Sequence, residues 1–263
     1  MHKAFYYDTC RFICGTGTET RLQDKDTPMI DKQRPDWNAG MQGMFTRISK
    51  RYDLLNTILS LGQDRAWRDA VLRSAELPDK GSVLDVGTGT GEIALDIKKS
   101  CPQLDVVALD LTTDMMKTGR DKPSGKDIRW INGDALAMPF SDMSFTRVTS
   151  GYLLRNVPDL SRTFREQLRV VKPGGKVVSL DFCPPRSRLL KPLLALYFRF
   201  VIPVLGGIVS GHWDAYRYLP DSINAFKSPE ELSSLMEAEG FVEVNFQRFM
   251  FDTVFVLCGT RPA

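Results

Sequence analysis

The stretch that decides the fold is Val83-Leu-Asp-Val-Gly-Thr-Gly-Thr-Gly91-Glu92. It opens on a short apolar strand pattern at residues 82–86, continues into a glycine-rich turn and leads into a predicted helix. Because glycine carries no Cβ, the turn lets a ligand approach the backbone closely. A strand, a glycine loop and a helix in this order are typical of α/β folds that bind nucleotide-containing cofactors.

The glycine spacing departs from the dinucleotide fingerprint. That fingerprint is G-x-G-x-x-G, whereas Gly87, Gly89 and Gly91 give G-x-G-x-G and the sixth place is Glu92. Asp85 lies at the strand end, where a carboxylate suits a cofactor with a cationic amino-acid end. A nicotinamide dehydrogenase stays open as an alternative, which titrations with each cofactor would separate.

Strand and helix patterns alternate along the rest of the chain. Further buried strands are predicted at 104–109, 127–132, 144–149 and 176–182, with a turn at 172–175. This alternation predicts a parallel sheet with helices on both faces. Two last strands, at 241–248 and 252–259, are joined too closely for a helical crossover and predict an antiparallel hairpin. We therefore expect an α/β, Rossmann-like fold with a mostly parallel seven-stranded sheet and a C-terminal hairpin.

Carboxylates follow the first three predicted strands. Asp110 ends the second strand, where a carboxylate accepts hydrogen bonds from ribose hydroxyls, and Asp134 follows the third, where it can accept from the amine of adenine. With Asp85, all three lie at carboxyl ends of parallel strands, where open α/β sheets bind ligands. For any one of them alone, the alternative is a helix N-cap or a turn.

Composition excludes several classes of protein. The chain has 263 residues, 25% of them charged, with a net charge of +3, which is ordinary for a globular protein and gives no sign of nucleic-acid binding. Only two histidines, His2 and His212, are present, so we expect no metal site. Five cysteines, an odd number, favour free thiols in a reducing compartment and hence a cytoplasmic protein.

The organisation predicted is one domain at 44–263 after a poorly structured extension at 1–43. A helical lid insertion is expected at about 185–225. Within it, the segment at 189–209 is highly apolar, but Lys191, Pro192, Arg199 and Pro203 interrupt it, so it is not a membrane span. The segment is either a lid that covers an apolar ligand and also contacts the membrane surface, or a core helix.

Longer motifs give the chain a resemblance to a known family. Met44-Phe-Thr-Arg-Ile-Ser-Lys-Arg-Tyr-Asp-Leu-Leu-Asn56, Leu154-Arg-Asn-Val157, Leu168-Arg-Val-Val-Lys-Pro-Gly-Gly175 and Tyr216-Arg-Tyr-Leu219 occur in the family's order. On these motifs the chain, from about residue 44 to its end, resembles the ubiquinone/menaquinone biosynthesis C-methyltransferases, a group of class I S-adenosylmethionine-dependent methyltransferases.

The resemblance implies a cofactor and a substrate class. Such enzymes use S-adenosyl-L-methionine to methylate a ring carbon of a prenylated quinol, either demethylmenaquinol or a methoxy-polyprenyl-benzoquinol. The residues expected to bind the cofactor are Asp85, Gly87, Gly89, Thr90, Gly91, Asp110, Asp134 and Ala135.

The substrate side is predicted from residue chemistry. Arg155 carries a permanent charge that can stabilise a phenolate, and His212 can titrate near neutral pH, so both are candidate catalytic residues. The alternative for Arg155 is a simple ion pair with a carboxylate such as Asp159. Candidate ring-binding residues are Tyr52, Asn56, Tyr152, Asn156 and Tyr216.

Three departures from the family's usual pattern lie on this side. Leu153 replaces a glycine, Asp181 replaces a glutamate, and the stretch at 211–214 is altered. They keep open another small aromatic or lipid acceptor, and a non-enzymatic scaffold that binds the cofactor in a quinone-biosynthesis complex. Retention of Arg155 and Asn156 argues against the scaffold. We expect peripheral contact with the inner face of the membrane; oligomeric state stays open.

Overall fold

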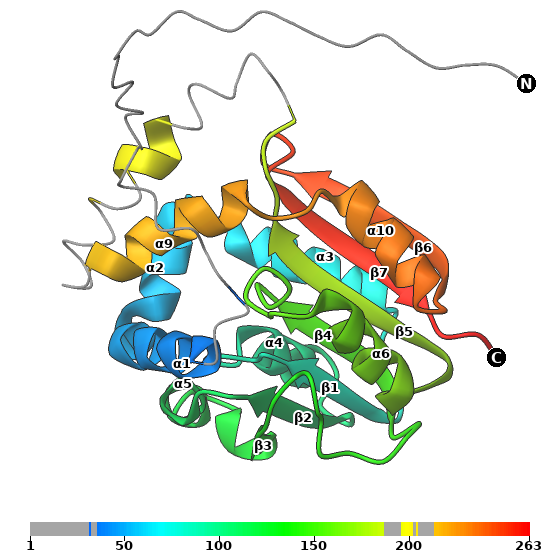
Figure 1. Ribbon diagram of the computed structural model, residues 1–263. Helices are drawn as coiled ribbons and strands as arrows, with labels where there is room; N and C mark the ends of the chain where they lie inside the picture. Colours follow the sequence, from blue (N-terminus) through cyan, green and yellow to red (C-terminus); the bar gives the residue numbers. More distant parts are fainter. Residues whose placement is uncertain (1–31, 33–35, 187–195, 202–203, 205–212) are drawn as a thin grey trace, which may run out of the picture.

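A computed structural model describes residues 32, 36–186, 196–201, 204 and 213–263. Seven strands form one sheet in the order β3-β2-β1-β4-β5-β7-β6 (Figure 1). Strands β1 to β5 pair in parallel, whereas β7 pairs antiparallel with both β5 and β6. This confirms the predicted sheet and hairpin. The strands are β1 (Ser82–Val86), β2 (Asp105–Asp110), β3 (Arg129–Asn132), β4 (Phe145–Gly151), β5 (Val171–Phe182), β6 (Val242–Phe249) and β7 (Val254–Thr260).

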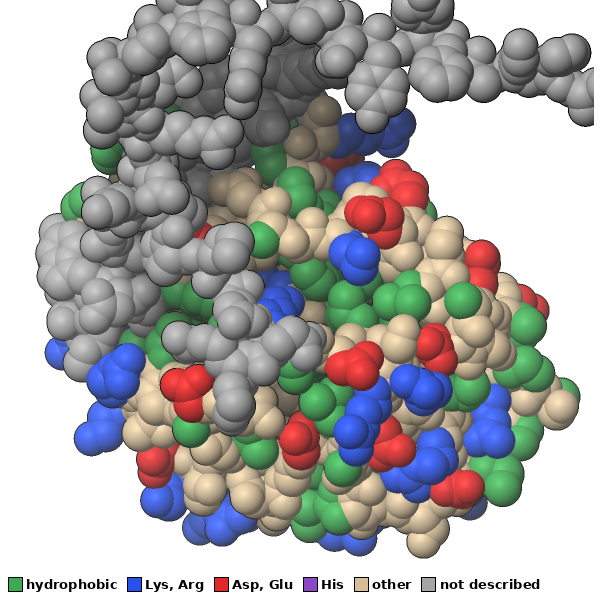
Figure 2. Space-filling model, viewed as in Figure 1, with side chains coloured by type: hydrophobic (Ala, Val, Ile, Leu, Met, Phe, Trp, Pro, Cys, Tyr) green, Lys and Arg blue, Asp and Glu red, His purple; other side chains and the backbone are tan. Residues whose placement is uncertain are grey.

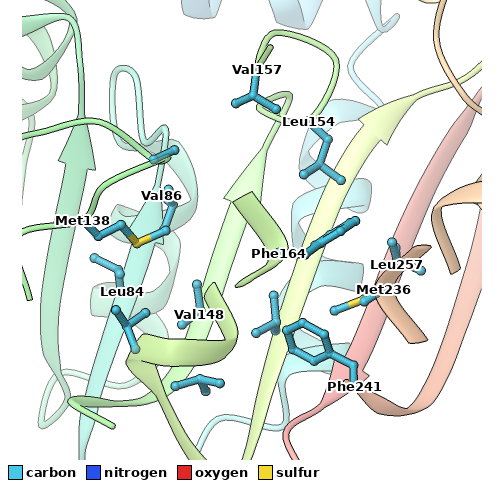
Figure 3. Close-up of a cluster of buried hydrophobic side chains, with 14 of the residues drawn as sticks. Leu84, Val86, Met138, Val148, Leu154, Val157, Phe164, Met236, Phe241 and Leu257 are labelled. Carbon is cyan, nitrogen blue, oxygen red and sulfur yellow. The ribbon is translucent and has the colours of Figure 1, made fainter. Parts of the chain in front are cut away.

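Helices cover both faces of the sheet. Side chains alternate along β1, so Leu84 and Val86 join one buried cluster with Phe164, while Val83 joins another. Figure 3 shows the first cluster, in which Met236 and Phe241 approach Phe164. Helices α6 (Leu160–Val170) and α10 (Pro229–Ala238) pack on that face, and α3 (Asp64–Ala75) and α4 (Glu92–Ser100) on the other. Helix α5 (Thr113–Arg120) and the 3₁₀ turn η2 (Gly125–Asp127) join β2 to β3.

Strand β5 is longer than the sequence predicted. It begins at Val171 and includes the Lys172–Gly175 stretch that was expected to be a turn. Val171 pairs with Phe145, but the next pair along joins Lys176 to Arg147, so the four residues between form a bulge. The glycines therefore interrupt the register without ending the strand.

The N-terminal helical region begins earlier than expected. Helix α1 (Trp37–Ile48) starts before residue 44, so the end of the predicted extension is helical. The 3₁₀ turn η1 (Ser49–Arg51) separates α1 from α2 (Tyr52–Leu59). Figure 1 shows α1 and α2 beside α5 and α9, at the end of the sheet that carries the site.

The lid region is described only in part. The short π-helix η3 (Tyr197–Val201) and helix α9 (Trp213–Asn224) lie in this region. Most of 189–209, and His212 as well, lie outside the described residues. None of the helices in the described ranges is both long enough and apolar enough to cross a membrane. Over the right-hand half of the face in Figure 2, basic and acidic side chains are interspersed, in line with the small net charge.

Candidate active site

The glycine loop lies between the ends of β1 and β4, where the strand order reverses. Gly87 and Gly89 both have positive φ angles, of +65° and +56°, which favour glycine. A Cβ on Gly87 would stand 2.7 Å from Cδ1 of Leu153, and one on Gly89 would stand 3.3 Å from Cε of Met115. The loop is thus shaped so that the backbone itself forms the wall of the site.

Asp85 is buried at the end of β1, with 1% of its surface exposed. Its two oxygens accept hydrogen bonds from the hydroxyls of Thr88, at 2.6 Å, and Thr149, at 2.8 Å. Burial raises the pKa of this carboxyl to about 6, although both hydroxyl hydrogen bonds oppose the shift. Asp85 therefore changes its charge close to neutral pH.

Asp110 and Asp134 follow β2 and β3 as predicted. Asp110 accepts backbone N–H bonds from Gly89 and Thr112, each at 2.7 Å, and burial raises the pKa of its carboxyl. Oδ1 of Asp134 accepts the N–H of Leu136 at 2.9 Å. The hydrogen bonds fix both carboxylates at the carboxyl edge of the sheet, where they can accept from a ligand.

These residues line a first cavity of about 770 Å³. Its walls include the glycine loop, the ends of β2 and β3, and the loop that follows β4. The predicted cofactor residues on its surface are Gly87, Gly89, Asp110, Asp134 and Ala135.

Helix α1 forms the roof of this first cavity. Gln42 donates from Nε2 to the carbonyl oxygen of Leu111 at 2.7 Å, and Asn38 donates from Nδ2 to Oδ2 of Asp134 at 3.4 Å. Met41 and Phe45 complete the roof on the same helix. The cavity is therefore closed by a segment whose role the sequence did not reveal, since residues 37–43 were assigned to the extension.

A third cavity of about 550 Å³ lies on the other side of the glycine loop and contains Asp85 and Thr90. Oδ1 of Asp53, in α2, accepts a hydrogen bond from the hydroxyl of Thr90 at 2.5 Å. Oδ2 of Asp53 pairs with Nζ of Lys122 at 2.6 Å, and Lys122 also bonds the carbonyl oxygen of Thr90 at 3.0 Å. These contacts fasten α2 to the glycine loop. The other acidic residues that line this cavity are Asp64 and Glu92.

A second cavity of about 750 Å³ is mostly apolar. Its charged residue is Arg155, which is only 5% exposed. Tyr52 and Tyr152 line all three cavities, so the second cavity adjoins both of the others. Its apolar lining is formed by Met44, Phe45, Ile48, Leu59, Trp67, Phe182, Leu219 and Met250.

Arg155 is paired with Asp181, not with Asp159. Its Nη1 donates to Oδ1 of Asp181 at 2.5 Å, and its backbone N–H donates to Oδ2 at 3.1 Å. Asp159 instead caps α6 by accepting the backbone N–H of Arg162. The predicted alternative, an ion pair, is thus present, but its partner is the carboxylate at the end of β5.

Aromatic rings surround this guanidinium. The rings of Tyr152 and Phe182 are stacked, with centroids 5.2 Å apart, and the Arg155 guanidinium carbon lies 5.3 and 5.4 Å from the two centroids. Tyr152 has a φ angle of +57°, a left-handed conformation that is uncommon for a tyrosine and concentrates at functional sites. Burial raises the pKa of Tyr52 and Tyr152, so both phenols are neutral donors at physiological pH.

Some predicted residues lie apart from these cavities or cannot be placed. Gly91, at the start of α4, lines none of the three cavities, and a Cβ on it would meet the ring of Trp130. His212 lies outside the described residues, and the side chain of Tyr216 is not described. Across the described ranges, no group of three or more His, Cys, Asp or Glu side chains is arranged to hold a metal ion.

The sequence reasoning also missed a tyrosine. Tyr218, two residues after the predicted Tyr216, lines the second cavity, and its hydroxyl donates to Oδ1 of Asn156 at 2.9 Å. Burial raises the pKa of Tyr218 to about 12. The motif at 216–219 contains both tyrosines. Which of them lines the cavity depends on the rotation of α9 about its own axis, which the spacing of the residues does not determine.

Comparison with known proteins accords with this geometry. The family model described as the ubiE/COQ5 methyltransferase family matches residues 31–261. A demethylmenaquinone methyltransferase of Deinococcus radiodurans is 44% identical, over 81% of this chain and 89% of that protein. A ubiquinone/menaquinone biosynthesis C-methyltransferase UbiE of Desulfotalea psychrophila is 40% identical, over 84% and 90%.

A solved structure shares the fold at low identity. Phosphoethanolamine N-methyltransferase 2 of Haemonchus contortus, in complex with S-adenosyl-L-methionine, superposes with a TM-score of 0.57 and 16% identity. The match covers 74% of this chain and 52% of that longer protein, so the chain spans about half its length. With the family model matched over nearly the whole described fold, the chain belongs to the ubiE/COQ5 methyltransferase family.

Proposed function

We propose that this enzyme transfers a methyl group from S-adenosyl-L-methionine to a ring carbon of a prenylated quinol, converting demethylmenaquinol to menaquinol. The observation that carries this proposal is the position of Arg155, buried on an apolar cavity that adjoins the carboxylate-lined cofactor cavity. Methoxy-polyprenyl-benzoquinol is the second candidate, because the Desulfotalea relative is named for both quinones.

The first cavity has the donor and acceptor set that the cofactor needs. Gly87 and Gly89 leave room against the backbone, and Asp110 is placed to accept from ribose hydroxyls. Asp134 is placed to accept from the adenine amine, while Asp85 in the third cavity suits an ammonium group. When bound there, the cofactor supplies a methyl group that is already activated on a sulfonium.

The chain's own residues prepare the acceptor. The apolar second cavity excludes bulk water, and Tyr52, Asn56 and Tyr152 orient the quinol ring. A phenol has a pKa near 10, so the phenolate needs stabilisation before its ring carbon becomes nucleophilic. Arg155 supplies a fixed positive charge for that oxygen, with a water as the proton acceptor. Once the ring carbon has gained the methyl group, its own hydrogen leaves as a proton and the oxygen beside Arg155 regains one, which restores the quinol with a net release of one proton.

The test is a transfer assay with two acceptors. Purified protein is incubated with methyl-labelled cofactor and either a short-tail demethylmenaquinol or a methoxy-prenyl-benzoquinol, both kept reduced. Label in the naphthoquinol alone supports the menaquinone role, and label in both indicates an enzyme of both pathways. Cofactor binding with no label in either acceptor contradicts quinol methylation and leaves another acceptor or the scaffold as the better explanation.

We also propose that the lid region, within the single domain, contacts the membrane surface where the prenyl tail resides. Large apolar side chains stay exposed there, including Leu196 and Phe200, the latter 55% exposed. Apolar side chains left in water are typical of an interaction surface. The test is flotation with vesicles, comparing the wild type with the double variant Leu196→Ser/Phe200→Ser. Exposed Met143, in the loop before β4, provides the control substitution Met143→Ser.

A further inference from the structure

Asp181 is the most completely buried charged group beside the second cavity, with no exposed surface. It lies near the end of β5, where pairing with Phe255 of the neighbouring strand β7 fixes its backbone in the sheet. Its Oδ1 accepts from Arg155 Nη1 and, at 2.8 Å, from the N–H of Phe182. Its Oδ2 accepts the backbone N–H of Arg155. Asp181 therefore holds both the backbone and the side chain of Arg155.

The Arg155 guanidinium has donor capacity beyond this pair. Its Nε is buried and has no hydrogen-bond partner, although buried donors are nearly always satisfied. Asp181 takes one edge of the guanidinium through Nη1, and the rings of Tyr152 and Phe182 lie beside it. A guanidinium that lines a cavity and has an unsatisfied hydrogen-bond donor is suited to bind an acceptor oxygen of a ligand.

We propose that Asp181 is a positioning residue, which directs the Arg155 guanidinium toward the quinol oxygen and supplies the counter-charge that lets a cation stay buried there. This inference rests on the proposed function, because it assigns Asp181 a role in that reaction through Arg155. It does not make Asp181 a proton acceptor, since the carboxylate already accepts three hydrogen bonds and lies behind the arginine.

The experiment is a double-mutant cycle with kcat and cofactor affinity as readouts. Asp181→Asn keeps the shape and removes the charge, and is expected to lower kcat about 100-fold through misplacement of the guanidinium. Arg155→Gln is expected to lower kcat about 100- to 1,000-fold, as loss of an oxyanion donor does. In the Arg155→Gln background, Asp181→Asn is expected to have no further effect on kcat, because Asp181 acts only through Arg155.

Two further variants separate positioning from folding. Asp181→Glu retains the charge, and its kcat is expected to recover most of the loss seen in Asp181→Asn. Asp142→Asn removes the carboxylate of another arginine ion pair, the exposed Asp142–Arg169 pair, and is expected to leave kcat unchanged. Cofactor affinity, measured by calorimetry, is expected to stay within about twofold in all folded variants, because Asp181 and Arg155 do not line the first cavity.

The outcomes separate the two proposals. Additive losses in the double variant, or a kcat for Asp181→Asn close to that of the wild type, would overturn the positioning role. If Arg155→Gln keeps full activity, the role of Arg155 fails and the positioning role of Asp181 fails with it. If the wild type methylates no quinol, the proposed function itself fails. If Asp181→Asn does not fold, the kcat of Asp181→Glu is compared with that of the wild type. The positioning role requires that this variant, which keeps the charge, retains at least about a tenth of the wild-type kcat, and a larger loss overturns it.

Discussion

The hydroxyl of Tyr218 in α9 donates to Oδ1 of Asn156 at 2.9 Å, and Nδ2 of Asn156 donates to the carbonyl oxygen of Tyr152 at 2.8 Å. The carbonyl oxygen of Asn156 in turn accepts from Nε1 of Trp37 in α1, at 2.9 Å. Asn156 thus connects the roof of the first cavity with the wall of the second.

We expect Tyr218→Phe to affect the quinol side of the reaction only. The variant loses one hydrogen bond worth about 1 kcal/mol, so kcat/KM for the quinol is expected to fall about fivefold. Cofactor affinity should change less than about twofold, because Tyr218 does not line the first cavity and Asn156, which does, keeps its bonds to Tyr152 and Trp37. Steady-state kinetics with each substrate varied in turn measure this. An equal loss of affinity for the cofactor would contradict the assignment of the two cavities.

Cofactor binding is expected to weaken in acid as Asp85 takes up a proton. Its pKa is about 6, so the carboxylate that favours a cationic amino-acid end becomes neutral below that pH. Calorimetric titrations at pH 5 and pH 7.5 should show weaker binding at pH 5 in the wild type. In Asp85→Asn the two affinities should be nearly equal, and an unchanged pH dependence in that variant would argue for another titrating group.

The same carboxyl should make the folded state less stable as pH rises. Its pKa is raised above the ordinary value of 3.8, so between about pH 4 and pH 6 the native state binds more protons than the unfolded state. The contribution of Asp85 to the free energy of unfolding therefore decreases as pH rises through that window, by about 3 kcal/mol in total. Urea unfolding of wild type and Asp85→Asn at pH 4.5 and 7 measures this, and the stability of the variant relative to wild type should rise with pH.

Opening the roof should weaken cofactor binding. Asn38→Ala/Gln42→Ala removes the two side-chain hydrogen bonds from α1 to the ends of β2 and β3. At about 1 kcal/mol for each bond, the cofactor Kd is expected to rise about 30-fold, with faster dissociation in stopped-flow traces. Gly40→Ala is the matched control on the same helix. A Cβ there meets nothing within 4 Å, so the helix should gain about 0.5–1 kcal/mol and dissociation should not accelerate.

We expect Gly91 to be needed for the stability of the fold and not for contact with the cofactor. It has a φ angle of +78°, and a Cβ there would lie 2.3 Å from Cη2 of Trp130. Gly91→Ala is therefore expected to destabilise the protein by about 3 kcal/mol through strain and overpacking. Gly174→Ala, also at positive φ but in open space, should lose only about 1 kcal/mol. Thermal unfolding compares them, and rescue of Gly91→Ala by Trp130→Leu would identify the steric contact as the cause.

Much of the fold could be predicted because its signals are local. The apolar runs correctly predicted all seven strands. The three carboxylates were found from their positions after strands, which follows from parallel topology alone. The β5 bulge was missed because Pro173 and two glycines normally end a strand, and only pairing with β4 shows that it continues.

The rest of the site depends on contacts between distant segments. Asp181 lies 26 residues from Arg155, and no spacing rule joins them. The α1 roof was missed because Gly40 and Gly43 weaken the helical pattern, which tertiary packing restores. Tyr218 could not be distinguished from Tyr216 without the orientation of α9 against the loop at Asn156.

The direction of β7 has a practical consequence for anyone who wishes to attach this enzyme to a support. Val254 pairs with Phe182 at the cavity end of β5, and Thr260 pairs with Lys176 toward its opposite end. The chain therefore leaves the sheet at the edge remote from the three cavities. A sensor chip or resin coupled through the C-terminus would hold the enzyme with its cavities turned outward, accessible to vesicles that deliver the acceptor.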